Sequence, residues 1–193
     1  MNLTSKDKLV VGLTGCILSG KSLALSFFKA CGAQTLSADE LAHEALESAA
    51  GKKAALAAFG ACEREKLAEL VFKNKTARQQ LEAILHPLIL REAAKRIRCC
   101  GKKLIVFEVP LLFEAGWENY ADLTLCVLAD PKTLPARLKG RGLSRAEYER
   151  RKKTQWPEEK KASAADVCIY HAGTEDLGKK VTHAYNALCK IYR

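Results

Sequence analysis

Short runs of apolar residues alternate along the chain with longer stretches whose apolar positions have helical spacing. Five runs are predicted to be strands, namely residues 9–13, 33–37, 103–109, 123–128 and 167–170. Runs that are apolar without alternation are typical of parallel strands with both faces buried. Strands that alternate with helices indicate an α/β fold with a doubly wound parallel sheet, in which ligands bind at the carboxyl ends of the strands.

The predicted helices carry recognisable end signals. Their spans are residues 22–31, 40–98, a basic stretch that runs to about residue 165, and an amphipathic closing helix at residues 177–192. Gly32 is expected to end the first of these helices. Within the long second stretch, Gly51 and Gly60 are expected breaks, and Pro87 is a kink or a boundary.

The composition is that of an ordinary globular protein. Of 193 residues, 48% are hydrophobic and 28% are charged, enough for one core with a small inserted region. No apolar run approaches the ~20 residues of a membrane span, and the polar residues 1–8 do not resemble a secretory signal. The eight cysteines form no C-x-x-C pair, and Cys126 and Cys168 fall in predicted buried strands. We therefore expect a cytoplasmic protein with reduced thiols, without membrane contact, zinc or disulfides.

The net charge of +10 is concentrated in one segment of the chain. Residues 137–161 hold ten Lys or Arg and four Glu, a net charge of +6. One interpretation is a mobile basic lid that closes over a phosphate-bearing substrate, and the other is a set of solvated helix faces. The chain has no aromatic stacking platform and no nucleic-acid module signature, so no nucleic-acid partner is expected.

Residues 15–22, GCILSGKS, have the spacing of a phosphate-binding loop, G-x-x-x-x-G-K-S/T. They lie between a predicted strand and a predicted helix, which is the context that this motif requires. Backbone N–H groups of such a loop and the helix N-terminus surround the phosphates. Lys21 would then contact the β- and γ-phosphates, and the Ser22 hydroxyl would bind Mg²⁺. The alternative is a chance turn of glycine and serine before a helix.

Cys16 and Leu18 occupy loop positions where glycine is common. Because the loop binds phosphate through main-chain amides, side chains matter only where the backbone needs a positive φ or a close approach. A left-handed conformation at Leu18 would cost about 1 kcal/mol. Cys16 is interpreted as a small filler, with a reactive thiol near the phosphates as the alternative.

Further motifs follow the loop along nearly the whole chain. They are residues 37–42 (SADELA), 85–89 (LHPLI) and 109–114 (VPLLFE), then Arg137, Arg141, Arg151 and Gln155, and finally Ala165-Asp166 and Gly173. Together with the loop they resemble the dephospho-coenzyme A kinase family, the last enzymes of coenzyme A synthesis. Residues 109–114 are the most specific part of this resemblance.

The resemblance implies a fold of the P-loop kinase type with an inserted helical substrate region and a basic helical lid. The expected divisions are a core with the phosphate loop (1–40), an acceptor-binding helical region (41–100), core (101–135), lid (136–164) and core (165–193). The implied reaction transfers a phosphoryl group from ATP, with Mg²⁺, to the ribose 3′-hydroxyl of dephospho-coenzyme A. A monomer or weak homo-oligomer is expected to carry it out.

The resemblance also implies roles for individual residues. The implied nucleotide-binding residues are Gly15, Leu18, Ser19, Gly20, Lys21, Ser22, Leu23 and Arg137. The implied catalytic residues are Lys21, Asp39 and Arg141, and Ser22 is the implied metal ligand. The implied acceptor-binding residues are Asp39, His86 and Glu114.

Each candidate outside the loop has a structural alternative. Asp39 follows the second predicted strand, where it would act as the base on the acceptor hydroxyl, but it would also suit a helix N-cap. Arg137 and Arg141 would close onto the phosphates or lie on the surface. His86 would contact substrate or be satisfied by backbone at a helix boundary. Glu108, at a strand end, would support Mg²⁺ or cap a loop.

The sequence departs from the family pattern at several of these positions. Leu23 stands in place of the usual Thr, Ser37 in place of the first Asp, and Tyr170-His171 in place of Asp-Asn. Two other functions stay open, a nucleoside or nucleoside monophosphate kinase and a nucleotide-dependent switch or nucleic-acid-binding ATPase. A guanine-selective switch would carry an Asn-Lys-x-Asp stretch, and this sequence has none.

Overall fold

The computed structural model describes residue 3 and residues 7–191. They divide into two compact units, a helical unit of residues 37–99 and a sheet unit formed by the described residues before and after it. Tyr192, the predicted end of the closing helix, and most of the polar stretch at residues 1–8 lie outside the described residues. None of the helices in the described part of the chain is long and apolar enough to cross a membrane.

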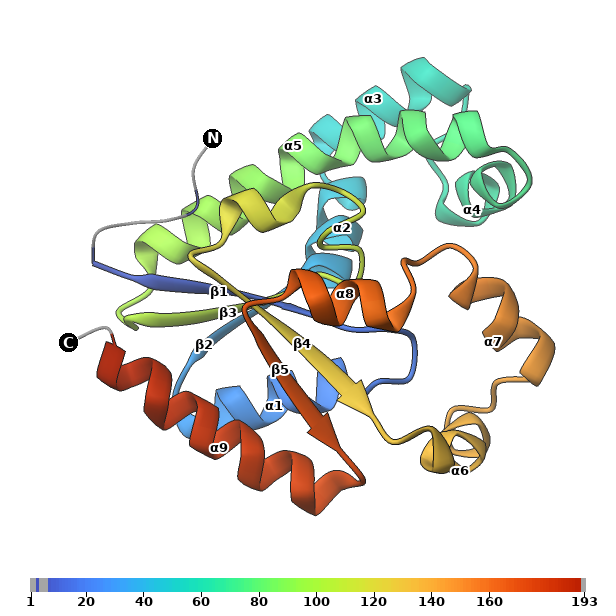
Figure 1. The fold of residues 1–193 in the computed structure, drawn as a ribbon. Coiled ribbons are helices and arrows are strands. Elements are labelled where there is room, and N and C mark those ends of the chain that lie inside the picture. The colour runs from blue at the N-terminus through green and yellow to red at the C-terminus, as the bar shows by residue number, and fades with distance from the viewer. Residues whose placement is uncertain (1–2, 4–6, 192–193) are drawn as a thin grey trace. The chain divides into compact units, whose positions relative to one another are not determined.

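The sheet unit is built on five strands in the order β2-β3-β1-β4-β5 (Figure 1). Their bounds are β1 Leu9–Thr14, β2 Gln34–Ser37, β3 Leu104–Glu108, β4 Leu123–Ala129 and β5 Val167–His171. β1 pairs in parallel with β3 and β4, and β4 pairs in parallel with β5. All five predicted strands are confirmed, with small differences at their ends.

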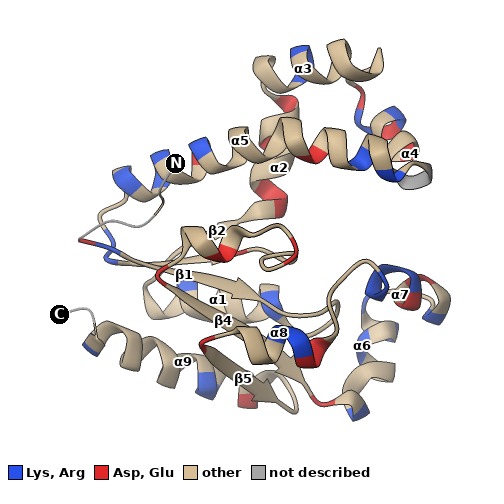
Figure 2. Ribbon diagram, turned by 45° about the horizontal axis from the view of Figure 1, so that its top comes forward, with Lys and Arg blue, Asp and Glu red and all other residues tan. Residues whose placement is uncertain are grey.

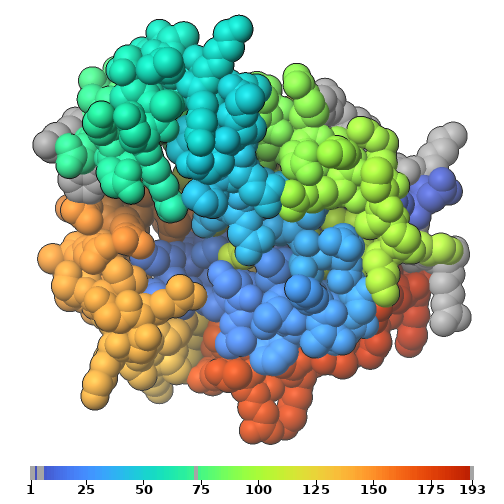
Figure 3. All heavy atoms as spheres, turned by 180° about the vertical axis from the view of Figure 1, so that it is seen from behind, coloured from blue at the N-terminus to red at the C-terminus, as the bar shows by residue number. Residues whose placement is uncertain are grey.

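Helices cover both faces of this sheet, which confirms the predicted doubly wound α/β fold. On one face, α1 (Lys21–Cys31) packs against α9 (Thr174–Ile191), and Figure 3 shows the two side by side. On the other face, α8 (Glu158–Ala164) contacts β4, and the short helix η1 (Trp117–Tyr120) contacts β1 (Figure 1). The segment after β4 forms η2 (Pro131–Thr133), α6 (Leu134–Gly140) and α7 (Arg145–Lys152).

The apolar runs of the sequence become the core of the sheet unit. Every residue of β1 and β3 is buried. Leu13, Phe28, Val127 and Leu177 belong to one continuous cluster and have no exposed surface. Full burial of one such side chain contributes about 1.5–3 kcal/mol to folding. This core holds the carboxyl end of β1, from which the phosphate-loop residues continue, in a fixed position.

The prediction that both strand cysteines are buried is half wrong. Cys126 in β4 is buried, but Cys168 in β5 is exposed. β4 has a strand on each side, whereas β5 is the last strand in the order, and Val167 and Tyr170 are exposed with Cys168. An apolar run of five residues does not distinguish an edge strand from a central one.

The helical unit contains α2 (Ala38–Glu47), α3 (Ala49–Phe59), α4 (Arg64–Lys73) and α5 (Lys75–Cys99). The other three helices all pack on α5. Leu46, Ala55 and Leu67 form its small buried cluster. Gly60 ends α3 with a φ of 67°, as predicted.

The predicted break at Gly51 and the interpretation of Pro87 as a boundary are wrong, whereas a kink at Pro87 stays a prediction. Gly51 lies inside α3, and the chain turns instead at Ser48, whose hydroxyl accepts a bond from the Gly51 N–H at 3.0 Å. A Cβ at Gly51 would lie 2.0 Å from the Ala45 carbonyl oxygen, so glycine here permits the close approach of α2 and α3. Pro87 lies within α5 and is not a boundary. Packing against three helices offsets the ~3 kcal/mol that an interior proline costs.

Candidate active site

The phosphate-loop residues connect β1 to α1, and their backbone requires glycine at two positions. Gly15 has a φ of 151°, and a Cβ there would lie 2.5 Å from the Val127 carbonyl oxygen. Gly20 caps the N-terminus of α1 with a φ of 95°. The tight approach of the loop to β4 and its left-handed entry into the helix therefore depend on these residues. The result is the strand–loop–helix arrangement that binds phosphate.

Leu18 has a φ of 62°, and it is the only non-glycine residue with a positive φ in the described part of the chain. Leu18 thus adopts the left-handed conformation whose energetic cost was considered in the sequence analysis. A leucine in this region costs about 1 kcal/mol of local strain. The loop therefore has a left-handed residue at this position that carries a branched, half-buried side chain.

Leu18→Gly is expected to leave ATP binding intact or to tighten it modestly. Glycine relieves the strain at the 62° φ, and its extra freedom in the unfolded chain costs an opposing ~0.5–1 kcal/mol. Calorimetry with ATP and a thermal melt measure the two effects. Leu18→Ala is the matched control, because it removes most of the side chain but keeps the strain. A tenfold loss of affinity in the glycine variant would show that the leucine side chain shapes the loop.

Cys16 is a buried filler of the loop rather than an exposed nucleophile. The residue is only 5% exposed, and its thiol donates to the Trp156 carbonyl oxygen at 3.7 Å. Burial raises the pKa of the Cys16 thiol, partly opposed by Lys161, so the reactive thiolate is disfavoured. These observations favour the filler interpretation over that of a reactive thiol.

Lys21 and Ser22 follow Gly20 at the start of α1. The Lys21 ammonium donates to the Cys16 carbonyl oxygen at 2.9 Å and is almost fully buried. The Ser22 hydroxyl donates to Glu108 Oε1 at 3.0 Å, and Glu108 is itself buried at the end of β3. The register of the sheet sets Glu108 beside Leu13 of β1. A hydroxyl and a carboxylate of the kind that hold Mg²⁺ in P-loop enzymes are therefore already in contact.

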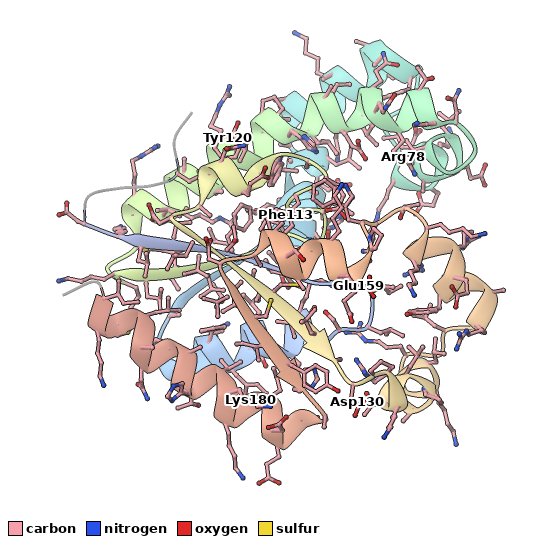
Figure 4. The ribbon with its side chains drawn as sticks, viewed as in Figure 1. Arg78, Phe113, Tyr120, Asp130, Glu159 and Lys180 are labelled. Carbon is pink, nitrogen blue, oxygen red and sulfur yellow. The ribbon has the colours of Figure 1, made fainter. Side chains whose placement is uncertain are left out.

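Arg137 contacts the loop from α6. Its guanidinium donates to the Leu18 carbonyl oxygen, to Thr133 Oγ1 and, at 2.7 Å, to the carbonyl oxygen of Asp130, which Figure 4 labels after β4. Burial lowers the pKa of Arg137, but an arginine stays charged at neutral pH. Arg141, by contrast, is exposed at the end of α6, where its backbone N–H bonds the Arg137 carbonyl oxygen. The structure therefore brings one predicted arginine to the loop and leaves the other at the surface.

A cavity of about 630 Å³ opens beside the loop within the sheet unit. Its walls come from the loop residues Cys16 to Ser19, from Arg137, and from the segment between Arg145 and Glu159. Ser19 Oγ, Glu114 Oε2 and Arg137 Nε are buried without a hydrogen-bond partner, and Glu118 Oε2 is the only other such side-chain atom among the described residues. Buried polar atoms normally have partners, so unsatisfied atoms on the loop and Arg137 fit a polar ligand at this place.

Two polar contacts to the loop were not found from the sequence. Gln155, which follows α7, accepts a bond from the Ile17 N–H at 2.8 Å. The imidazole of His171, at the end of β5, lies 2.8 Å from the Ser19 carbonyl oxygen. In the sequence, Gln155 belongs to a motif and His171 departs from one. Neither pattern gives the contact, because the partners are 138 and 152 residues apart.

Glu114 makes polar contacts with the segment that follows α7. Its Oε1 accepts from the Trp156 N–H at 2.7 Å and lies 3.0 Å from the ammonium of Lys161, which is fully buried. Lys161 also donates to the Pro110 carbonyl oxygen at 2.6 Å. Phe113, labelled in Figure 4, stacks on the Trp156 ring with centroids 6.0 Å apart. Oε1 of Glu114 thus has two polar contacts, whereas Oε2 is buried without a hydrogen-bond partner.

Asp39 and His86 belong to the helical unit. Ser37 is the N-cap of α2, since its hydroxyl accepts a bond from the Glu40 N–H at 3.4 Å. The alternative that Asp39 caps this helix is therefore wrong. Asp39 is exposed in the first helical turn, with its carboxylate available for another role. His86 is half-buried inside α5, and burial lowers the pKa of its imidazole, so the ring is neutral at neutral pH.

The basic residues of α7 are visible as a blue cluster in Figure 2. Several of them form ion pairs on the helix itself, Arg145 with Glu149 at 3.1 Å and Arg151 with Glu147 at 2.5 Å. Such exposed pairs contribute about 0–1 kcal/mol each. Part of the positive charge is thus balanced locally, while Lys152 and Lys153 line the cavity beside the loop.

The loop, the Ser22–Glu108 contact and the parallel sheet define a P-loop phosphotransferase of the kinase type. A family model described as dephospho-CoA kinase matches residues 9–176. The chain belongs to the dephospho-CoA kinase family. It is 39% identical over 181 residues to the dephospho-CoA kinase of Geobacter metallireducens, with 87% of this chain and 90% of that protein covered.

Solved structures of similar fold are also known. A crystal structure of a Thermus thermophilus protein superposes with a TM-score of 0.84 at 32% identity, covering 94% of this chain and 97% of that one. A dephospho-CoA kinase from Campylobacter jejuni superposes with a TM-score of 0.69 at 24% identity, covering 95% and 98% of the two chains. The second match supports the fold alone.

Proposed function

We propose that the protein transfers the γ-phosphoryl group of ATP to the ribose 3′-hydroxyl of dephospho-coenzyme A, giving coenzyme A and ADP. The observation that carries this proposal is a complete phosphate loop, with Lys21 buried and Ser22 bonded to Glu108, in a chain of the dephospho-CoA kinase family. The terminal P–O bond of ATP breaks, a new P–O bond forms to the acceptor oxygen, and the hydroxyl proton passes to a general base, for which Asp39 is proposed below. No other reactant is required.

The phosphate side of the reaction is assigned to the sheet unit. Loop N–H groups and the positive end of α1 bind the β-phosphate, and Lys21 balances charge on the transferring group. Ser19 Oγ and Arg137 Nε supply further donors, because both are buried and unsatisfied. Gly15, Gly20 and Leu23 shape the loop and its helix. The residues of the lid, including Arg141, complete the positive environment.

Mg²⁺ is proposed to bind at Ser22 with support from Glu108. The residues fit the ion, since hard cations prefer oxygen ligands and a hydroxyl already lies 3.0 Å from a buried carboxylate. The ion would neutralise phosphate charge during transfer. Glu108 orients the Ser22 hydroxyl through their hydrogen bond.

The acceptor side is assigned to the helical region, residues 41–100, together with Asp39 and Glu114. Asp39 is proposed as the general base, because it follows β2, is exposed, and is not needed as a helix cap. His86 would contact the acceptor as a neutral imidazole, with its pKa lowered by burial. Glu114 Oε2 is the remaining acceptor contact, supported by its buried and unsatisfied state.

The protein is proposed to work in the cytoplasm as a monomer or weak homo-oligomer, without a nucleic-acid or membrane partner. Its two substrates are small phosphorylated molecules, which accounts for positive charge around the loop without a polyanion partner. Sedimentation and binding to nucleic acid at two salt concentrations test these statements. Steeply salt-dependent binding to nucleic acid would contradict them.

The function is tested with purified protein, Mg·ATP and separate acceptors, with ADP release as the readout. We expect turnover with dephospho-coenzyme A and none with nucleosides or nucleoside monophosphates. Chelation of divalent ions should abolish turnover, and added Mg²⁺ should restore it. Mass measurement of the product identifies coenzyme A. Turnover with nucleoside monophosphates but none with dephospho-coenzyme A would overturn the proposal.

A further inference from the structure

His171 is buried at the carboxyl end of β5, with only 4% of its surface exposed. Its Nε2 lies 2.8 Å from the carbonyl oxygen of Ser19, and its Nδ1 lies 3.1 Å from the carbonyl oxygen of Gly173. Carbonyl oxygens only accept hydrogen bonds, so the ring must donate wherever a bond forms. The shorter contact assigns a proton to Nε2, and the imidazole therefore binds the backbone of the phosphate loop.

The peptide that His171 binds has little conformational preference of its own. Ser19 stands between Leu18, with a φ of 62°, and Gly20, with a φ of 95°. Glycine tolerates several orientations of the peptide that precedes it, so an external contact is needed to select one of them. A Cβ at Gly20 would lie 3.0 Å from Nε2, which shows how closely the ring approaches the loop.

The geometry of a trans peptide links this contact to phosphate binding. The C=O of Ser19 and the N–H of Gly20 belong to one planar unit and point in opposite directions. No cis peptide bond occurs in the described part of the chain. With the Ser19 carbonyl held against His171, the Gly20 N–H is directed away from the imidazole ring. A hydrogen bond to the carbonyl also polarises the peptide and strengthens its N–H as a donor.

We propose that His171 is a positioning residue that fixes the Ser19–Gly20 peptide, so that the Gly20 N–H binds a phosphate of the nucleotide. The proposal rests on the proposed function only as far as the loop binds ATP. His171 reaches the loop through Nε2, the ring nitrogen that lies farther from its own backbone. The role is specific to the nucleotide and does not extend to the acceptor.

Three substitutions separate the two contacts of the ring. In His171→Gln the side-chain amide occupies the place of Nε2 and keeps a donor for Ser19. In His171→Asn the shorter amide occupies the place of Nδ1, so it keeps the Gly173 contact and loses the loop. His171→Leu removes both contacts and leaves a side chain of similar bulk.

ATP affinity is measured by calorimetry without acceptor, alongside KM values for both substrates and a thermal melt. The Leu and Asn variants should bind ATP about tenfold more weakly, the usual scale of one lost hydrogen bond in a charged site. The Gln variant should stay within about threefold of the unmodified protein. The KM for dephospho-coenzyme A should be unchanged in all three.

Unchanged ATP affinity in His171→Leu, together with a lower melting temperature, would overturn the proposal in favour of a purely structural role. If His171→Leu does not fold, equal ATP affinities of the Gln and Asn variants would overturn it. Calorimetry with ATP alone keeps this test separate from the identity of the acceptor. Failure of the unmodified protein to phosphorylate dephospho-coenzyme A would contradict the proposed function but not the role of His171.

Discussion

Lys21→Ala is expected to lower turnover by roughly 10³–10⁵-fold, the range that a cationic group on a transferring phosphoryl contributes. The Lys21 ammonium is almost fully buried and is held by the Cys16 carbonyl oxygen at 2.9 Å. In a site that excludes water, a fixed charge stabilises the transition state far more strongly than in solution. Steady-state kinetics with ATP and dephospho-coenzyme A measure the loss.

The fold should survive this substitution. The loop is held by backbone geometry at Gly15 and Gly20, and alanine has the highest helix propensity at the start of α1. Lys29→Ala is the matched control, because Lys29 lies in the same helix, has the same charge and is exposed. Near-normal turnover of Lys21→Ala, with a correctly folded protein, would show that this loop is not the active phosphate site.

Asp39→Asn is expected to reduce turnover by about 10²–10⁴-fold, the usual contribution of a general base. Asparagine keeps the size of the side chain but cannot accept the acceptor's proton. ATP affinity should change little, since the phosphate contacts come from the loop. Acceptor affinity should fall only modestly, because one hydrogen bond is weakened rather than removed.

The capping role of Ser37 sharpens this experiment. Because Ser37 rather than Asp39 caps α2, Asp39→Asn removes only a charge from the first helical turn, worth about 0.3–1 kcal/mol. Glu40→Gln is the matched control, since it removes an exposed charge from the same turn. It should lose similar stability while keeping full turnover. Equal turnover of Asp39→Asn and Glu40→Gln would contradict the assignment of Asp39 as the general base.

The sheet and its loop could be predicted because their signals are local. Buried parallel strands are continuous apolar runs, and the loop is recognised by the spacing of two glycines, a lysine and a serine. The sequence also marked Leu18 as the loop position where a left-handed conformation would carry a cost, and the φ there is 62°. In each case the residues that carry the signal are also the residues that form the structure.

The errors occurred where the outcome depends on distant parts of the chain. Gly51 and Pro87 are breakers by local propensity, yet helix packing retains both inside helices. Cys168 is exposed because β5 has a neighbour on one side only, which a run of apolar residues does not reveal. The contacts of Gln155 and His171 with the loop depend on topology in the same way.

The buried pair of Lys161 and Glu114 restricts how this sequence can change over evolution. Lys161 has no exposed surface, and its ammonium is divided between Glu114 and the Pro110 carbonyl oxygen. Loss of either partner of such a pair costs about 3–5 kcal/mol, a large part of the stability of a typical domain. Residues 110–114 and 156–161 should therefore be inherited as one block. A chimaera that takes one of these segments from a relative needs the other from the same parent.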